Sequence, residues 1–380
     1  MKVTHDGRRM TVEVTADGEG LVSHAGSALL SQVADKTGLT RALSRELSGL
    51  QLRAGSHDRG RVIRDLAVML ADGGDCLADI GALGDQAVLF GQVASTSTAF
   101  RVIDQIASDP GGLECLRAAH AGARARVWQL TGAPERLTID LDATLLGSHS
   151  DKEGAAGNFK GGFGFHPMLA YADQTGEALA GELRPGNAGA NSAADQIAVA
   201  EQALAQIPAE HIEGIELLLR VDSAGASHEL LDWAREARIG FSVGYDLTET
   251  VRAAIVHIPD QAWVCAIDQD GSQRPNGHVC EITEQLDLSN WPTGARVLVR
   301  RERAHPGAQL TFTDLDGHRF QAILTDQPGG DIAKLERDHR ARARVEDTSA
   351  TTKTPACATC RFATSSTTAS GWNLSASRTT

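Results

Sequence analysis

The sequence predicts an α/β protein in which a mixed-sheet core follows a helical region and is interrupted by a β-rich insertion. Three observations lead to this prediction. Apolar residues recur three and four positions apart from residue 27 to about 130, the period changes to two at residue 136, and helix-like and strand-like segments then alternate up to residue 246. A chain of 380 residues with 42% hydrophobic side chains is long enough for two or three domains.

Residues 1–130 are predicted to be a helical region that begins with a hairpin. The first 20 residues alternate weakly, which suits two short strands. The segments "TGLTRALSREL" and "TSTAFRVIDQI" suit short helices that begin at Thr or Ser caps. Such helices occur in DNA-binding units and in ordinary bundles, and the pattern by itself favours a bundle.

Residues 131–249 carry the pattern of the core. "RLTIDLDATLL" (136–146) alternates Leu and Ile with Thr and Asp, which predicts a strand with one polar face. Further strands are predicted at 164–173, 177–186, 214–223 and 239–246, with helices at 191–207, capped by Asn191 or Ser192, and at 227–237. A meander of three strands followed by alternating helices and strands is the order expected of a ribonuclease-H-like core.

The rest of the chain divides into three parts. Residues 250–329 contain short alternating runs such as "ARVLVRR" and "RFQAILT" between turn residues, which predicts a β-rich insertion. A helical pattern returns at 330–347 and predicts the last core helix. Residues 348–380 have little charge and no apolar period, so a disordered tail is expected there.

Composition excludes several classes of protein. No apolar run reaches the roughly 18 to 20 residues of a membrane span, and the polar N-terminus is unlike a signal peptide, so no membrane partner and a cytoplasmic location are expected. No glycine-rich phosphate loop follows a strand, which argues against a nucleotide-dependent metabolic enzyme. The net charge of −13 does not favour nucleic acid, but 296–305 and 334–344 are locally basic.

Three aspartates stand where metal-dependent chemistry would need them. Asp140 and Asp142 lie two apart in one predicted strand and therefore project from the same face. Asp222 ends an apolar strand, at the edge where ligand sites of open α/β sheets gather. Carboxylates grouped in this way suit Mg²⁺. The alternative is that they are strand-end aspartates that face solvent.

The last predicted helix offers a further carboxylate, from a third element of the fold. Arg342 and Glu346 are four residues apart and share a helix face with His339. A solvated helix with ion pairs along its surface would have the same pattern.

The order of these landmarks resembles one family of enzymes. His339-x2-Arg342-x3-Glu346-x6-Lys353 is similar to the Tyr-x2-Arg-x3-Glu-x6-Lys signature of DDE transposases of the insertion-sequence-four superfamily, with His in place of Tyr. "LTIDLDATLLGSHSDKEGAAGNFKGGFGFHPMLAYAD", "RPGNAGANSAAD" and "LLLRVDSAG" resemble the first- and second-acid regions of its thirteen-eighty family. The resemblance covers roughly residues 20–347.

The resemblance implies a set of catalytic acids. Asp142 would be the first acid, with Asp140 as the alternate, Asp222 the second and Glu346 the third. Together they would hold two Mg²⁺ ions, for which Mn²⁺ can substitute.

The resemblance also implies DNA as the partner. His339, Arg342 and Lys353 would contact DNA, the latter two at phosphates near the cut. The enzyme would cleave at the terminal inverted repeats of an insertion sequence and join the 3′-hydroxyls to target DNA, as a homodimer in the synaptic complex and associated with the nucleoid. Two alternatives stay open: a nuclease with the same core, and an inactive protein that binds the ends and inhibits transposition.

The tail departs from the family pattern. Relatives continue past the glutamate as a charged helix, whereas this chain turns to Thr, Ser, Ala and Cys after Asp347. One back-translation of "TPACATCRFATS", read one base earlier, gives "DTGLRNLPFRDF", which resembles the family continuation. We therefore expect a shift of reading frame that truncates the C-terminus, which would make the positions of Lys353 and of the Cys357-x2-Cys360 pair incidental. No second pair completes a zinc site.

Overall fold

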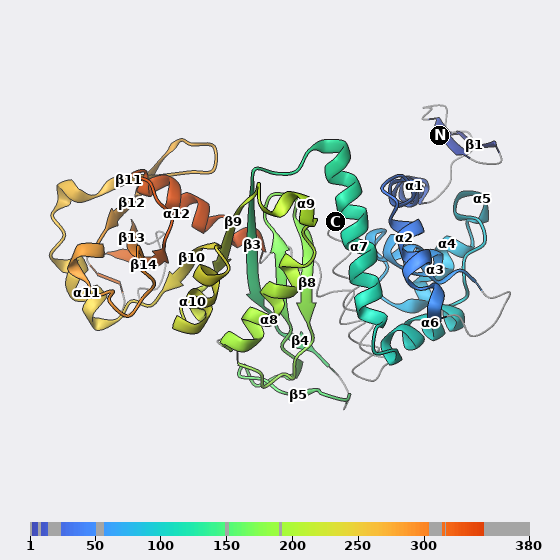
Figure 1. The fold of residues 1–380 in the computed structure, drawn as a ribbon, viewed down its shortest axis with the longest axis horizontal. Helices are drawn as coiled ribbons and strands as arrows, with labels where there is room; N and C mark the ends of the chain where they lie inside the picture. Colours follow the sequence, from blue (N-terminus) through green and yellow to red (C-terminus); the bar gives the residue numbers. More distant parts are fainter. Residues whose placement is uncertain are drawn as a thin grey trace.

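The computed structural model describes residues 2–6, 9–13, 24–50, 57–148, 152–189, 192–303, 314–315 and 317–345. The predictions for Glu346, Lys353 and residues 348–380 fall outside this part of the chain. The described residues form a mixed α/β structure in which a helical region lies beside one large sheet (Figure 1).

The N-terminal part contains the predicted hairpin and helices. Strands β1 (Lys2–Asp6) and β2 (Arg9–Glu13) pair antiparallel. The helices are α1 (Ala28–Lys36), α2 (Leu39–Glu46), α3 (Arg59–Ala71), α4 (Ile80–Gly84), α5 (Ala87–Phe90), α6 (Thr96–Ser108) and α7 (Gly112–Thr131). The Ser95 side chain caps α6 as predicted, whereas α2 follows Gly38, which has a positive φ, rather than a Thr cap. These helices enclose a hydrophobic cluster of their own around Leu66 and Ile106.

Nine strands form the large sheet, in the order β11-β12-β13-β14-β10-β9-β3-β7-β8. Their bounds are β3 (Arg136–Ala143), β7 (Met168–Ala172), β8 (Glu177–Glu182), β9 (Glu216–Val221), β10 (Gly240–Tyr245), β11 (Val264–Ile267), β12 (Gln273–Glu281), β13 (Arg296–Arg303) and β14 (His318–Thr325). Strand β3 pairs parallel with β9 and antiparallel with β7, and β9 pairs parallel with β10. The predicted order of strands and helices from residue 136 to 246 is therefore present.

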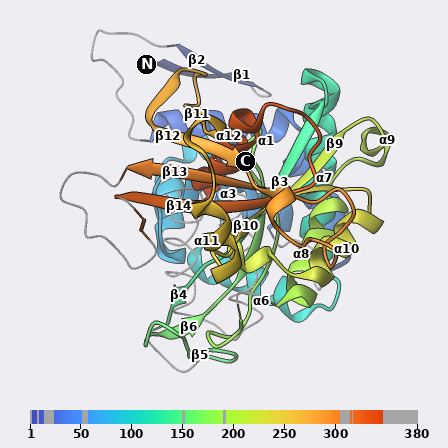
Figure 2. The ribbon, with the colours of Figure 1, turned by 90° about the vertical axis from the view of Figure 1, so that its left-hand side faces the viewer.

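The β-rich segment departs from the prediction in two ways. Strand β14 pairs antiparallel with β10, so β11–β14 extend the core sheet and satisfy what would otherwise be an open strand edge (Figure 2). The segment also contains a helix, α11 (Glu249–Val256), because the Thr248 side chain accepts the amide of Val251 and caps it.

The last helix is shorter than predicted. Helix α12 (Ile332–Arg340) ends at Arg340, a turn follows at 341–342, and residues 343–345 are helical again. The amide of Arg342 bonds to the carbonyl of His339, and the amide of Val345 bonds to that of Arg342, so each bond spans three residues instead of four. Arg342 therefore lies in a turn after α12 and not within the helix that carries His339.

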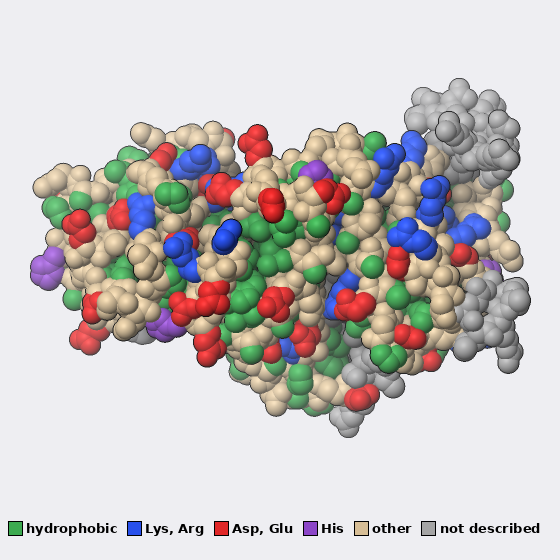
Figure 3. All heavy atoms as spheres, viewed as in Figure 1, with side chains coloured by type: hydrophobic (Ala, Val, Ile, Leu, Met, Phe, Trp, Pro, Cys, Tyr) green, Lys and Arg blue, Asp and Glu red, His purple; other side chains and the backbone are tan. Residues whose placement is uncertain are grey.

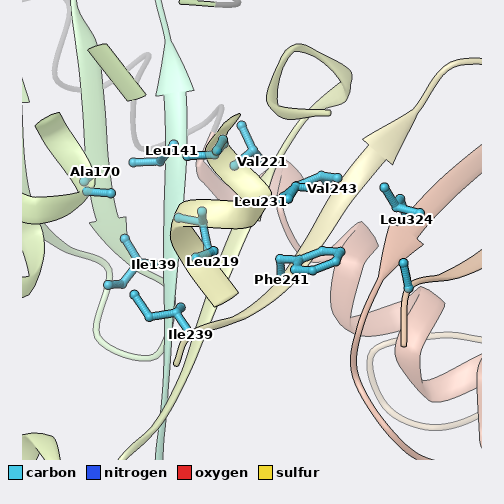
Figure 4. Close-up of a cluster of buried hydrophobic side chains, with 14 of the residues drawn as sticks. Ile139, Leu141, Ala170, Leu219, Val221, Leu231, Ile239, Phe241, Val243 and Leu324 are labelled. Carbon is cyan, nitrogen blue, oxygen red and sulfur yellow. The ribbon is translucent and has the colours of Figure 1, made fainter. Parts of the chain in front are cut away.

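The two faces of the large sheet differ in chemistry because side chains alternate along each strand. One face packs Ile139, Leu219 and Phe241 against α8 (Ala193–Leu204) and α10 (His228–Glu236), as Figure 4 shows in part. Ser192 caps α8, as predicted. Phe241 is completely buried, which contributes about 1.5–3 kcal/mol relative to an exposed side chain. The opposite face carries polar side chains beneath α12.

Two smaller units complete the description. Helix α9 (Ala209–Ile212) precedes β9. Strands β4 (Leu146–Gly147), β5 (Ala156–Gly157) and β6 (Phe163–Phe165) form a separate three-stranded sheet, called here the small sheet, in the order β4-β6-β5. It follows β3 directly and projects beyond the end of the large sheet (Figure 1).

Candidate functional site

The register of two parallel strands brings two of the predicted acids to one level. Asp140 on β3 pairs with Arg220 on β9, an offset of 220 − 140 = 80 residues. Asp142 and Asp222 each lie two residues further along and have the same offset, 222 − 142 = 80. The backbone of Asp222 remains extended, with φ −70° and ψ −169°. Both residues therefore lie at the carboxyl ends of neighbouring strands, and the alternation of side chains is expected to direct them to the face that carries Asp140 and Arg220.

A tight turn fixes the position of Asp222. Its Oδ1 accepts the amide of Ala224 at 3.0 Å, which caps the short 3-10 turn Ser223–Gly225. Gly244 on β10 lies directly beneath this turn, since a Cβ there would be 2.6 Å from the Ser223 nitrogen and 3.0 Å from the Asp222 carbonyl carbon. Glycine at 244 is what lets the turn approach β10 this closely.

Asp142 lies under the chain that follows α12. Its Oδ1 is 3.9 Å from Nη1 of Arg342, and both side chains are less than one fifth exposed. Val345 is 3% exposed and packs in a cluster with Leu169, the residue opposite Asp142 on β7. The segment 341–345 is thus held over the first candidate acid by packing as well as by charge.

Asp140 lies one pleat below, in a different environment. Its two carboxylate oxygens accept Nε and Nη2 of Arg220 at 2.5 and 2.7 Å, and both side chains are almost fully buried. Burial raises the pKa of Asp140 to about 6, while the hydrogen bonds and charge of Arg220 act in the opposite direction. Arg220 also lies 3.2 Å from Asp173 and donates to the carbonyl of Asp338 on α12.

His339, predicted to contact DNA, packs against the sheet. Its Nδ1 lies 2.9 Å from Oγ of Ser242 on β10. Burial, together with the positive charges of Arg220 and Arg342, lowers the pKa of His339 to about 3. The imidazole is therefore neutral, and it holds the end of α12 on the polar face.

A cleft opens beside Asp222. Its volume is about 820 Å³, and α12, β10 and β14 contribute to its walls. Four arginines line it, together with Asp222: Arg252, Arg300, Arg340 and Arg342. The basic stretch 296–305 pointed to Arg300, but nothing in the sequence pointed to Arg252, because α11 was not predicted.

The donor set at the strand ends suits a hard divalent cation, because Asp142 and Asp222 supply carboxylate oxygens at one edge. The third predicted ligand, Glu346, is outside the described residues. Within the described part of the chain, one compact group of potential ligands is Asp75, Cys76 and Asp79. Asp79 there accepts the amides of Asp75 and Cys76, which lowers its pKa and identifies the group as a turn cap.

Comparisons with known proteins identify a family and structural neighbours. Residues 4–373 match the family model described as "Transposase DDE domain group 1". A cryo-EM structure of a piggyBac transposase synaptic complex with hairpin DNA is 8% identical, with a TM-score of 0.43, over 92% of this chain and 79% of that one. No curated protein matches the sequence. Among the described residues, no helix is both long and apolar enough to cross a bilayer.

Proposed function

Because this chain belongs to the group 1 family of transposase DDE domains, we propose that it cleaves DNA at the ends of an insertion sequence and transfers the 3′-hydroxyls into target DNA. The observation that carries the proposal is the register of β3 and β9, whose offset of 80 residues supports a position of Asp142 near Asp222 at one sheet edge. We assign the chain to the thirteen-eighty family of insertion sequences, on the acid regions and the Arg342–Glu346 spacing.

The fold assignment within this proposal is a ribonuclease-H-like core. The partial order β8-β7-β3-β9-β10, with three antiparallel strands followed by two parallel ones, supports it. The helical region to residue 130 would recognise the transposon ends. On the face drawn in Figure 3, several Lys and Arg side chains lie together over that region.

Different residues of the proposed site have different roles. Asp142, Asp222 and Glu346 would hold two Mg²⁺ ions, or Mn²⁺, which supply an activated nucleophile and stabilise the leaving oxygen when bound. Arg342 sits over Asp142 and, with the other arginines of the cleft, would hold the phosphate backbone without reading bases. Asp140 is proposed to pair with Arg220 and not to bind a metal ion.

Plasmid cleavage tests the proposal. A supercoiled plasmid that carries both ends of the element is incubated with the full chain and Mg²⁺. The chain is expected to cut at the ends, and Asp142→Asn, Asp222→Asn and Glu346→Gln are each expected to abolish cutting while end binding persists. Asp232→Asn, at an exposed position on α10, is the matched control. Full cleavage by Asp222→Asn would refute the assignment.

The same reaction separates the rival functions. Joined products in the presence of target DNA distinguish a transposase from a nuclease with this core. End binding without any Mg²⁺-dependent cutting identifies an inhibitory end-binding protein.

The proposed reading-frame shift after Asp347 is tested by the nucleotide sequence, in which a neighbouring frame should continue the charged helix. The synaptic complex is proposed to contain two copies, acting at the nucleoid.

A further inference from the structure

The hairpin of β5 and β6 exposes a large aromatic side chain at its tip. Phe159 is 73% exposed, and Phe163 on the following strand is 40% exposed. Phe is usually buried, and these two lie in one hairpin rather than scattered over the surface. The exposed tip is therefore a candidate contact surface.

The turn that carries Phe159 is well defined. Oδ1 of Asn158 accepts the amides of Lys160 and Gly162, both at 3.0 Å. Gly161 adopts a φ of +78°, a conformation that favours glycine. These bonds define the backbone of the turn that carries Phe159 and Lys160.

The chemistry of the tip combines an aromatic face with a positive charge. Nζ of Lys160 lies 5.6 Å from the centroid of the Phe159 ring. On another side the ring meets His166, with centroids 5.8 Å apart, and His166 is 2% exposed and hydrogen-bonded to the carbonyl of Ala188. An exposed aromatic ring beside a lysine suits a nucleobase that stacks on the ring while its phosphate pairs with the ammonium group.

The small sheet is anchored next to the candidate acids. Only two residues separate the end of β3 from the start of β4. Leu146 and Phe165 of the small sheet share a buried cluster with Leu169, which pairs with Asp142 on the large sheet. A strand of DNA whose phosphate reaches Asp142 would therefore pass close to the base of this hairpin.

Resting on the proposed function, we propose that Phe159 and Lys160 bind the DNA that flanks the scissile phosphate. One base stacks on the Phe159 ring, and a neighbouring phosphate pairs with Lys160. Every base offers a π face, so the contact positions the strand without selecting a sequence. The hairpin is thus a positioning element for the DNA strand.

Photocrosslinking tests this contact without requiring catalysis. The full chain, as Asp222→Asn so that the DNA stays intact, is irradiated with a duplex whose single-stranded tail contains 4-thiothymidine. Crosslinks are expected in the peptide 152–164. Phe159→Ala should lose them, and Phe159→Trp should retain them. Ile212→Ala, at an exposed apolar position on α9, is the matched control and should crosslink normally.

Cleavage kinetics provide the second readout. With the parent chain, Phe159→Ala is expected to lower the single-turnover cutting rate about tenfold, with Phe159→Trp restoring it and the circular dichroism spectrum unchanged. Phe159→Ala that crosslinks and cuts like the parent would overturn the inference. Parent-like cutting by Asp142→Asn would instead refute the proposed function, while the crosslink still decides whether the tip binds DNA.

Discussion

Arg220 forms a two-pronged ion pair with Asp140, one pleat below the two candidate acids. The same guanidinium reaches Asp173 next to β7 and the Asp338 carbonyl on α12, so a single side chain ties together the strands that carry the acids and the helix above them. The proposed position of Asp142 near Asp222 depends on the parallel register of β3 and β9, in which Asp140 lies opposite Arg220.

Replacing Arg220 by Met should destabilise the protein strongly. The change leaves the Asp140 carboxylate buried without its partner, which costs about 3–5 kcal/mol. Urea unfolding followed by tryptophan fluorescence measures the loss. Arg45→Met, which removes an exposed pair with Glu46, should cost less than about 1 kcal/mol. Equal losses for the two variants would contradict the role given to Arg220.

His339 should make the protein less stable in acid. Its pKa is about 3 in the folded state, below the ordinary value of about 6.5, so between these values the unfolded chain binds more protons. Stability from this residue is complete above pH 6.5 and is lost as the pH falls toward 3. His339→Asn should flatten that part of the stability profile, measured by urea unfolding at several pH values.

Comparing the pH dependence of stability of the parent chain and of His339→Asn separates the contribution of His339 from those of two other groups. His120 has a pKa lowered to about 3 by burial and contributes with the same sign. Asp140, with its pKa raised to about 6, contributes the opposite trend between about pH 4 and 6. Both contributions remain in His339→Asn and cancel in the difference. Identical profiles for parent and variant would show that His339 is not held neutral.

Gly244→Ala should damage the site more than the fold. The added methyl group meets the backbone of Ser223 and Asp222, so the turn that aims Asp222 must shift. DNA cleavage should fall well below that of the parent at saturating Mg²⁺. Gly122→Ala is the control, because Gly122 is inside α7 and the added carbon meets nothing within 4 Å beyond the backbone of its own helix, so the change should be neutral or slightly stabilising. Equal activity of both variants would place Asp222 outside the reaction.

Arg342→Ala should weaken DNA binding without changing sequence preference. A lysine or arginine at a phosphate releases about one counterion, so the slope of log affinity against log salt should become shallower by about 0.9. The same change removes the positive charge beside Asp142 and should tighten Mg²⁺ binding. Titrations of DNA and of Mg²⁺ check the two opposite effects. Weaker binding of both would indicate that the site had collapsed.

Local patterns were sufficient to predict much of the core. The alternation around Asp140 and Asp142 located β3, and the apolar run before Asp222 located β9. The helix α11 was missed because its Val and Ile residues suit strands equally well, and the cap at Thr248 decides the outcome.

Long-range relationships could not be read in the same way. The pairing of β14 with β10 joins segments some 80 residues apart, and no local period encodes it. The partner of Asp140 was also missed, although an arginine inside "LLLRVD" is costly to bury alone and so indicates a buried carboxylate nearby.

The most direct test of the central claim locates the bound metal. Iron(II) with ascorbate and peroxide, used in place of Mg²⁺, cuts the polypeptide next to the site where the ion binds. Fragments are expected to end near residues 142 and 222, to be lost in both Asp142→Asn and Asp222→Asn, and to be retained in Asp75→Asn. Cuts confined to residues 75–79, or fragments unchanged by the substitutions at 142 and 222, would contradict it.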